Sequence, residues 1–253
     1  MKISFLGTGT SLGVPVVACQ CKVCRNGAAK DKRLRSSIMV EEKGTTIVID
    51  AGPDFRYQML RENVKHVDAI LITHHHQDHV AGLDDVRSFN FLSGKPMDVY
   101  ATISDQERIK EEFSYAFKPR TYPGVPSYNL ITVDEKAFEV NHLKIFPFKV
   151  LHMKMEVLAF KIGDFAYITD VNYIPGNVLP ELLNCKVIVL GALQKSKHIS
   201  HYSLPEAIDV LNFLRPEKAF ITHISHSMGF HEEIENQLPA FIRFAYDGLK
   251  IEI

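Results

Sequence analysis

Short apolar segments recur along the whole chain, and most of them have the length and the β-branched content of strands. In the first half, the predicted strands are residues 4–7, 38–41, 46–50, 69–73, 98–101 and 130–133. In the second half they are residues 143–150, 156–162, 165–169, 186–190 and 218–222, with a closing strand from Gly248. Helices are predicted at residues 54–63, at 104–117 with Ser104 as its N-cap, and at 204–213.

The order of these segments mixes short hairpin connections with longer helical crossovers. This mixture predicts an α/β protein with two packed sheets and helices outside them, a four-layer αββα sandwich. No low-complexity linker or short repeat divides the chain, so we expect a single domain over residues 1–253. The segment 118–128, KPRTYPGVPSY, contains three prolines and is predicted to be a loop.

Composition narrows the classes of function. The chain has 253 residues, 46% of them hydrophobic, which is enough for a substantial core. A formal net charge of -1 gives no overall basic field, which argues against a nucleic-acid partner and leaves small anionic substrates open. The start MKISFLGTGTSLG lacks a signal-peptide core, and no run of about 18 apolar residues occurs, so we expect a cytoplasmic protein with no membrane partner. A homodimer is left open.

The segment LITHHHQDHVAG, residues 71–82, carries the strongest chemical signal. It follows a predicted buried strand and has the pattern H-x-H-x-D-H, formed by His74, His76, Asp78 and His79. Imidazole nitrogen and carboxylate oxygen suit zinc, manganese, iron or nickel. Four such ligands in six residues can hardly all face one ion, so the pattern indicates two adjacent metals. The alternate positions, His75 and Gln77, are not predicted to take part.

A dinuclear site needs further ligands, and three more residues follow apolar runs in the same way. His152 follows FPFKVL, Asp170 ends FAYITD and His223 ends AFITH. Each alone would be a cap or a surface residue, but their occurrence together with H-x-H-x-D-H favours a shared site.

Three of the four cysteines, Cys19, Cys21 and Cys24, lie within six positions. In a reducing compartment, clustered thiols are more often metal ligands or redox groups than parts of a disulfide framework. The fourth, Cys185, is predicted to be a buried strand residue.

The set of motifs resembles the metallo-β-lactamase superfamily, whose members carry H-x-H-x-D-H followed by a His, an Asp and a last His in this chain order. The resemblance covers nearly the whole chain, from FLGTGTS to THISH, and implies the αββα fold of that family. It implies that one metal is held by His74, His76 and His152, and the other by Asp78, His79 and His223. It further implies that Asp170 and a water bridge the metals, and that Asp78 accepts a proton from that water. Asp50, which ends TTIVID, matches a strand-end Asp of the family that would support the site from behind the ligands, and a turn-capping residue before Gly52 is the alternative.

Within the superfamily, the cysteines resemble the C-x-C-x-x-C of PhnP-type phosphodiesterases, from phosphonate breakdown. This resemblance implies one structural zinc, held by Cys19, Cys21, Cys24 and His226. It implies a small phosphodiester or nucleotide as substrate, with 5-phosphoribosyl 1,2-cyclic phosphate as the family's named one, hydrolysed with two divalent metals (manganese, zinc or nickel). His201, in HYSLPEA, resembles the family's catalytic histidine and would be the general acid.

Several alternatives stay open. A PqqB-like protein, from quinone-cofactor biosynthesis, shares the fold and a cysteine cluster. The tRNA 3′-processing nucleases carry a Gly/Pro-rich arm, and the loop from Lys118 to Pro126 is too short to be one. A non-catalytic nucleotide- or metal-binding protein is the third alternative, and His201 beside a complete ligand set argues against it.

Arg56 and Arg87 are candidate hydrogen-bond donors to a substrate phosphate, although solvated surface arginines are the simpler interpretation. For His198, the simpler interpretation is a surface histidine.

Overall fold

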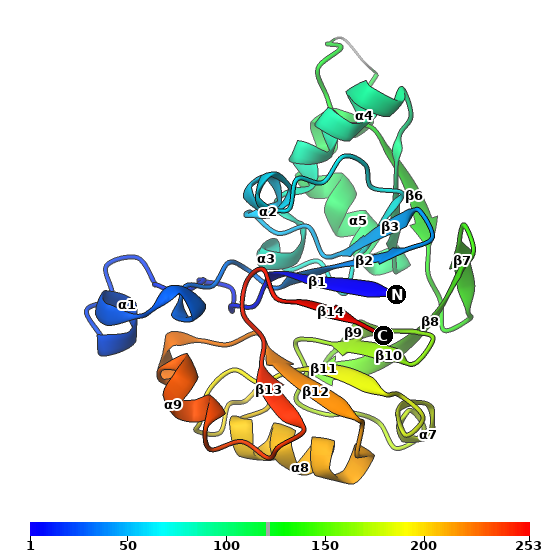
Figure 1. Cartoon of the computed structure of the whole chain (residues 1–253). Coiled ribbons are helices and arrows are strands. Elements are labelled where there is room, and N and C mark those ends of the chain that lie inside the picture. Colours follow the sequence, from blue (N-terminus) through cyan, green and yellow to red (C-terminus); the bar gives the residue numbers. More distant parts are fainter. Residues whose placement is uncertain (120–121) are drawn as a thin grey trace.

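Two seven-stranded sheets packed face to face form the centre of the molecule in the computed structural model, which describes residues 1–119 and 122–253 (Figure 1). The predicted loop at 118–128 includes residues 120–121, which lie outside the described residues. The first sheet has the order β14-β1-β2-β3-β4-β5-β6 and the second β13-β12-β11-β10-β9-β8-β7.

The first sheet is antiparallel at one end and parallel at the other. Strands β14, β1, β2 and β3 pair antiparallel, whereas β3, β4, β5 and β6 pair parallel. Its strands are β1 (Lys2–Gly7), β2 (Ser37–Glu42), β3 (Thr45–Ile49), β4 (Ala69–Leu71), β5 (Met97–Ala101), β6 (Tyr128–Thr132) and β14 (Lys250–Glu252).

The second sheet has the same mixed character. Strands β7 to β10 pair antiparallel with their neighbours, and β10 to β13 pair parallel. Its strands are β7 (Phe138–Val140), β8 (Leu143–His152), β9 (Met155–Ile162), β10 (Phe165–Ile168), β11 (Val187–Gly191), β12 (Lys218–Thr222) and β13 (Ile242–Phe244).

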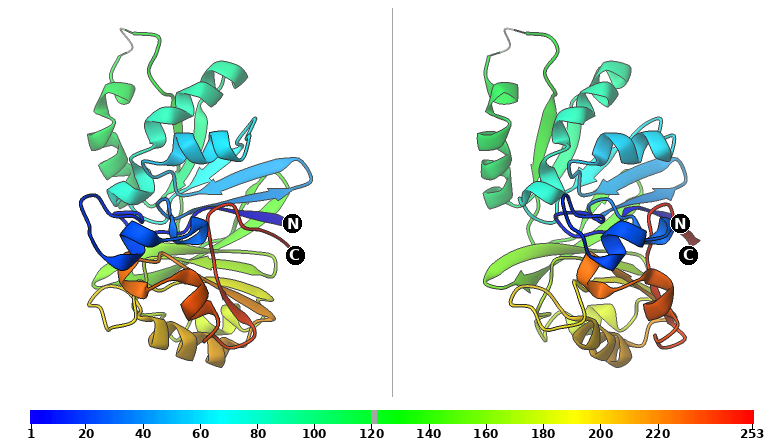
Figure 2. Two further views of the ribbon diagram at one scale, coloured as in Figure 1. Left: turned by 60° about the vertical axis from the view of Figure 1, so that its left-hand side comes forward. Right: turned by 90° about the vertical axis from the view of Figure 1, so that its left-hand side faces the viewer.

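Helices cover the outer faces of both sheets, which confirms the predicted αββα sandwich (Figures 1 and 2). Over the first sheet lie α2 (Phe55–Arg61), α4 (Arg87–Ser93), α5 (Ile103–Glu112) and α6 (Ser114–Phe117). The second sheet is covered by α7 (Leu179–Leu182), α8 (Leu204–Leu214) and α9 (His231–Glu235). The short helices α1 (Lys22–Asn26) and α3 (Gln77–Val80) belong to loops. None of the helices in the described residues is long and apolar enough to cross a membrane.

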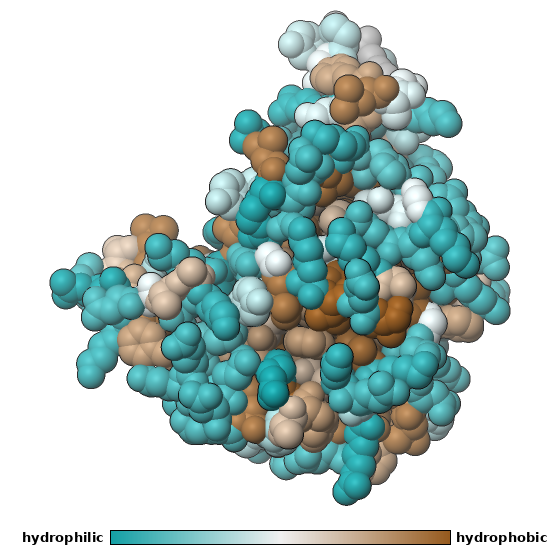
Figure 3. Space-filling model, in the orientation of Figure 1, coloured by the Kyte–Doolittle hydropathy of each residue, from teal (hydrophilic) through white to brown (hydrophobic). Residues whose placement is uncertain are grey.

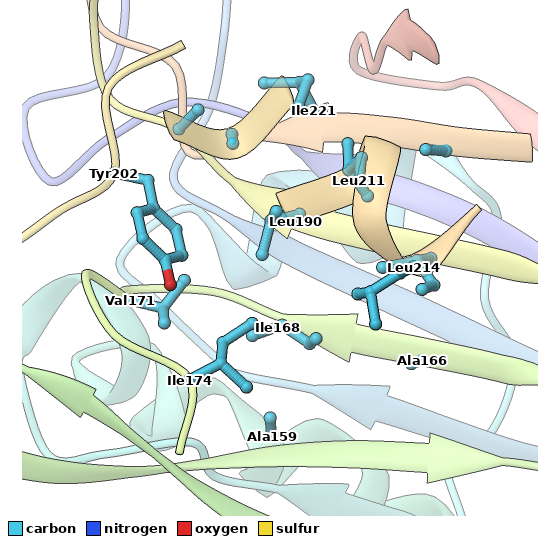
Figure 4. Packing of buried hydrophobic residues seen from close by; sticks show 14 of the residues in the cluster. Ala159, Ala166, Ile168, Val171, Ile174, Leu190, Tyr202, Leu211, Leu214 and Ile221 are labelled. Carbon is cyan, nitrogen blue, oxygen red and sulfur yellow. The ribbon is translucent and has the colours of Figure 1, made fainter. Parts of the chain in front are cut away.

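Apolar side chains fill the space between the sheets and the space under the helices. Strands β3 and β11 are buried along their whole length, as expected for strands covered on both faces. Under the second sheet's helices, Leu211 and Leu214 of α8 pack with Ile168 and Leu190 from the strands (Figure 4). This rigid scaffold holds the loops at the strand ends, where the predicted chemistry lies.

The two chain ends lie side by side, and the Met1 amino group donates to the Ile253 carbonyl at 2.8 Å. Figure 3 shows apolar atoms gathered around this place. Met1, Leu249, Ile251 and Ile253 are partly buried there, against the core between the sheets.

Some predicted elements were wrong in detail. The helix predicted at 104–117 is two helices, α5 and α6, separated at Phe113, whose ψ of 33° is not helical. The N-cap of α5 is Thr102 and not Ser104, because the Thr102 hydroxyl accepts the Asp105 amide. Helix α4 and strands β7 and β13 were not predicted from the sequence. Helix α4 has no fully buried side chain, and β7 and β13 have three residues each, so their sequences show no detectable hydrophobic pattern.

Candidate metal centre

The seven predicted ligands of the dinuclear site come from strand ends and loops of both sheets, and the structure brings them together. His74 follows β4, His152 ends β8, Asp170 follows β10 and His223 follows β12. His76 is the N-cap residue of α3, whose first turn contains Asp78 and His79. The sheets are tied close to this place, since the Leu158 amide donates to the Thr73 carbonyl at 2.9 Å. All the ligands are buried except His76, which is half-buried.

Asp170 lies between two groups of these side chains. Its Oδ1 is 3.0 Å from His223 Nδ1 and 3.4 Å from His79 Nε2, and Asp78 completes this first group. Its Oδ2 is 3.8 Å from His74 Nε2, which is 3.0 Å from His76 Nδ1 in the second group. Each carboxylate oxygen of Asp170 therefore faces a different set of potential ligands, as a residue that bridges two ions would.

His152 is held beside the second group by the loop that precedes α8. Its Nδ1 donates to the Ser200 carbonyl at 2.6 Å, which leaves the lone pair of Nε2 free for a metal. The centre of its ring is 5.4 Å from that of His76 and 4.5 Å from that of His201. His201 is itself within ligand distance of His152 and Asp170, so the structure permits a ligand role for His201 that the sequence did not indicate.

Asp50 is the buried support, and not merely a turn residue. It is fully buried and accepts hydrogen bonds from the Thr73 amide, the Thr73 hydroxyl and His79 Nδ1, the last at 2.7 Å. The proton of His79 is thereby fixed on Nδ1. Its Nε2 is buried without a hydrogen-bond partner in the part of the chain described, and it faces Asp78 and Asp170. A buried, unpartnered imidazole nitrogen beside two carboxylates fits a cation at this place.

Three strand-end residues of the site have left-handed backbone conformations. Their φ angles are 66° for Asp50, 52° for Asp170 and 58° for His223. Residues with a side chain rarely adopt this conformation, which costs about 1–3 kcal/mol where the surrounding structure imposes it. Such strain concentrated at one place is typical of a functional site.

The charges of the site suit cations as well. Burial lowers the pKa of His74 well below its usual value, and burial also lowers the pKa of His223, so both are neutral and have a lone pair at neutral pH. Burial opposes ionisation of Asp170, but His223 and His79 outweigh it and hold its pKa well below the usual range. Burial alone would lower the pKa of His79, yet Asp170, Asp50 and Asp78 raise it well above its usual value. These carboxylates leave negative charge in the cluster that a cation would neutralise.

The cysteine cluster forms a separate group of potential ligands. The Sγ atoms of Cys19, Cys21 and Cys24 lie 3.2, 3.4 and 3.5 Å from His226 Nδ1. The Cys24 amide donates to Cys21 and is the main reason that the pKa of the Cys21 thiol falls to about 6, which favours the thiolate that zinc binds. Figure 2 shows α1 (blue) against the orange segment that contains the turn His226–Met228.

Other candidate residues lie outside these groups. His75 contacts Asp105 at 2.7 Å and Gln77 contacts Glu112, so the two omitted motif positions point away from the metal ligands. Arg87 pairs with Asp84, and Arg56 is exposed. Cys185 is buried as predicted, but it precedes β11 and is not part of a strand.

Comparison with known proteins decides the family. Residues 45–224 match the family described as "Beta-lactamase superfamily domain". The chain belongs to the metallo-β-lactamase superfamily. The family resemblance and the fold expected from the sequence are thus confirmed.

Individual members of the superfamily differ in how closely they match. A solved structure described as "a New Diphosphatase from the PhnP Family" is 36% identical, with a TM-score of 0.93 over 100% of this chain and 97% of that one. Zn(2+)-bound PqqB from Methylobacterium extorquens is 19% identical with a TM-score of 0.81 over the whole of both chains, and shows the shared fold.

A protein named octanoyltransferase, from Porphyromonas gingivalis, is 36% identical over 99% of this chain. The chain spans about half of that relative, 51% of its length. The name therefore describes a much longer protein than the segment that matches.

Proposed function

We propose that this chain is a dinuclear-metal-dependent hydrolase that cleaves phosphodiester bonds in small cyclic phosphates or nucleotide-like substrates. The observation that carries the proposal is Asp170, whose two carboxylate oxygens face separate sets of buried histidines. Two divalent cations at such a site lower the pKa of a shared water and neutralise charge on a phosphoryl group.

The assignment of ligands follows the two groups. His74, His76 and His152 would hold one ion, Asp78, His79 and His223 would hold the other, and Asp170 would contact both. Manganese, zinc or nickel suits these nitrogen and oxygen donors. The four-residue set Cys19, Cys21, Cys24 and His226 would hold one zinc, because three thiolates and an imidazole make a closed tetrahedral site.

Asp78 is the proposed proton acceptor for the attacking water. It is buried, which alone would raise its pKa, but His79 and His223 lower the pKa below its usual range. The carboxylate is therefore ionised at neutral pH and able to take up a proton. It contacts His79 at 3.2 Å, so it lies among the ligands that would surround the water.

His201 is the proposed general acid for the leaving oxygen. The centre of its ring lies 4.5 Å from that of His152 and 5.0 Å from that of His223. Burial and then the nearby His223 lower the pKa of His201 to about 3, so the side chain is neutral at pH 7 in the protein alone. An anionic phosphate bound beside it would raise that pKa. We therefore expect His201 to take up its proton together with the substrate.

The likeness to a PhnP-family diphosphatase supports a substrate that contains phosphorus. Hydrolysis of a diphosphate bond makes the same demands on the site as hydrolysis of a phosphodiester, since each needs charge neutralisation at phosphorus and a proton for the leaving oxygen. Diphosphate-linked nucleotides therefore join cyclic phosphates as candidate substrates.

One relative favours a second candidate reaction, cleavage of an acyl thioester. A protein named octanoyltransferase matches nearly all of this chain, although the chain spans only half of that protein. Two metals that activate a water at phosphorus can equally activate it at a carbonyl group.

A substrate screen of the metal-loaded protein tests the two candidates together. The substrates are bis(p-nitrophenyl) phosphate, a small cyclic phosphate, a diphosphate-linked dinucleotide, octanoyl thioester and a β-lactam. We expect turnover of phosphodiesters, little of the β-lactam, and loss of all turnover in His76→Ala. Strong thioester hydrolysis without phosphodiester hydrolysis would replace the first proposal by the second.

A further inference from the structure

The side chain of Asn172 joins two loops that carry proposed site residues. Its Oδ1 accepts the Met153 amide at 2.7 Å, and its Nδ2 donates to the Ile199 carbonyl at 3.3 Å. Met153 follows His152, Ile199 lies two residues before His201, and Asn172 itself lies two residues after Asp170. One amide group thus connects the loop of Asp170 to the turn that follows His152 and to the loop that precedes His201.

Backbone bonds hold Asn172 in place independently of its side chain. The Asn172 amide donates to the Leu151 carbonyl at 2.8 Å, and the Leu151 amide donates to the Tyr173 carbonyl at 2.9 Å. On the other side of the loop, the Tyr202 amide donates to the Val171 carbonyl at 2.7 Å, and Figure 4 shows these two residues close together. Loss of the Asn172 amide group therefore leaves the backbone around Asp170 anchored.

The loop before His201 depends much more on the Asn172 side chain. Residues 195–199 are all exposed, and the Ile199 side chain is 75% exposed, so packing does little to fix this segment. Two side chains hold its consecutive carbonyl groups, Asn172 at Ile199 and His152 at Ser200. These two bonds hold the chain just before His201, and the backbone bonds of Tyr202 to Val171 and Leu193 hold it just after.

We propose that Asn172 is a positioning residue that holds the loop at Ile199 so that His201 stays between the rings of His152 and His223. The inference rests on the proposed function, because it concerns His201 as the general acid. Asn172 acts only through the loop and contacts no reacting group. The position requires one acceptor and one donor on the same short side chain, which an amide provides and a carboxylate does not.

Two substitutions separate the two bonds. Asn172→Asp retains an acceptor for the Met153 amide but loses the donor to Ile199, whereas Asn172→Ala loses both. Asn129→Ala is the matched control, since Asn129 donates to Asp98 at 2.8 Å on an exposed part of β6. Misplacement of a catalytic group by about 1 Å can lower a rate by about 100-fold. We expect kcat to fall about 10- to 100-fold in both Asn172 variants with a poor alkoxide leaving group, and much less with p-nitrophenolate.

Two measurements do not depend on turnover. Hydrogen–deuterium exchange in residues 195–203 should be faster in both Asn172 variants than in the wild type and in Asn129→Ala. Metal content, measured by elemental analysis, should equal that of the wild type in all of them.

The outcomes separate this inference from the proposed function. Unchanged exchange in 195–203 overturns the role of Asn172, and so does an equal loss of rate with both leaving groups or a loss of active-site metal. If the wild type hydrolyses no phosphodiester, the proposed function fails, while the exchange data still show whether Asn172 holds the loop.

Discussion

At the scale of single residues, hydrogen bonds to two histidines of the site decide which ring nitrogen each of them can offer to a metal. Asp50 fixes the proton of His79 on Nδ1, and the Ser200 carbonyl does the same for His152. In each ring Nε2 is thereby the nitrogen left for a metal, and on His79 a metal would replace the proton that the neighbouring carboxylates hold there at neutral pH. Because the partners are buried, these orientations are settled before any metal binds.

Asp50→Asn should therefore weaken metal binding without removing a ligand. The amide cannot satisfy His79 and both donors of Thr73 at once, so the imidazole loses its fixed tautomer. Loss of such an outer partner typically lowers metal affinity about 10- to 100-fold. Competition with a chromophoric chelator measures the change, with the partly exposed Asp98→Asn as the control. Unchanged affinity would show that Asp50 does not orient His79.

His201→Ala should lower kcat by about 10²- to 10⁴-fold on substrates with a poor alkoxide leaving group, the usual contribution of general acid catalysis. The loss should be smaller with p-nitrophenolate, which leaves without a proton. Metal content should stay at the wild-type level. If the variant loses metal, His201 is a ligand, as its distance from His152 and Asp170 allows, and His198 becomes the next candidate for the acid.

The sequence revealed the potential ligands because each follows an apolar run that must end at a strand terminus. It could not show the bonds that orient them. The carbonyl that holds His152 lies 48 residues away in the chain, and Asn172 stands in a loop without any distinctive motif. Contacts of this kind depend on how loops meet after folding, which local pattern does not encode.

At the scale of elements, α1 has little packing of its own to hold it in place. It has five residues, none of them buried, and helices this short are unstable alone in water. Its contacts with the rest of the molecule run through Cys24 and through Cys21, the N-cap residue, toward His226. Metal binding is the interaction that would stabilise it.

Cys21→Ser should release one zinc per chain and expose the loop around α1 to proteolysis. His76→Ala should have the opposite pattern, keeping this zinc and losing active-site metal. Elemental analysis of both proteins makes the comparison. Full zinc content in Cys21→Ser would mean that the cysteine cluster is not a structural zinc site.

The boundaries of a strand could be predicted from the sequence where every residue of the strand is buried. Strands β3 and β11, buried throughout, lie within one residue of their predicted limits. The prediction of one helix over 104–117 was wrong at Phe113, because the residues on both sides favour a helix whereas the backbone turns at Phe113 itself. Three-residue edge strands such as β13 give too few positions for any periodicity.

At the scale of the whole molecule, a buried arginine joins distant parts of the chain. Arg33 donates to the Thr8 hydroxyl at 2.8 Å and to the Ala245 carbonyl at 2.6 Å, and it contacts His231 at 3.0 Å. Asp247, which is partly buried, accepts from the Leu34 amide beside it. Residues near the start and the end of the sequence thus meet around one charged group, an arrangement that the order of predicted strands did not show.

Arg33→Met should lower the free energy of unfolding by about 2–4 kcal/mol, because it leaves the buried Ala245 carbonyl and Thr8 hydroxyl without their charged donor, at about 1–3 kcal/mol for each such group. Urea unfolding of the metal-loaded protein measures the change. The exposed pair of Arg108 and Glu111 supplies the control, and Arg108→Met should change stability by about 0.5 kcal/mol or less. A loss below about 1 kcal/mol in Arg33→Met would contradict a structural role for this charge.

The central claim, two cooperating metals that hydrolyse a phosphodiester, is tested most directly by a titration. Protein stripped of its active-site metal is titrated with Mn²⁺ while release of p-nitrophenolate from bis(p-nitrophenyl) phosphate is followed. The arrangement of ligands on both oxygens of Asp170 predicts that the rate rises and levels off at two equivalents per chain. A plateau at one equivalent, or no release at any metal concentration, would contradict it.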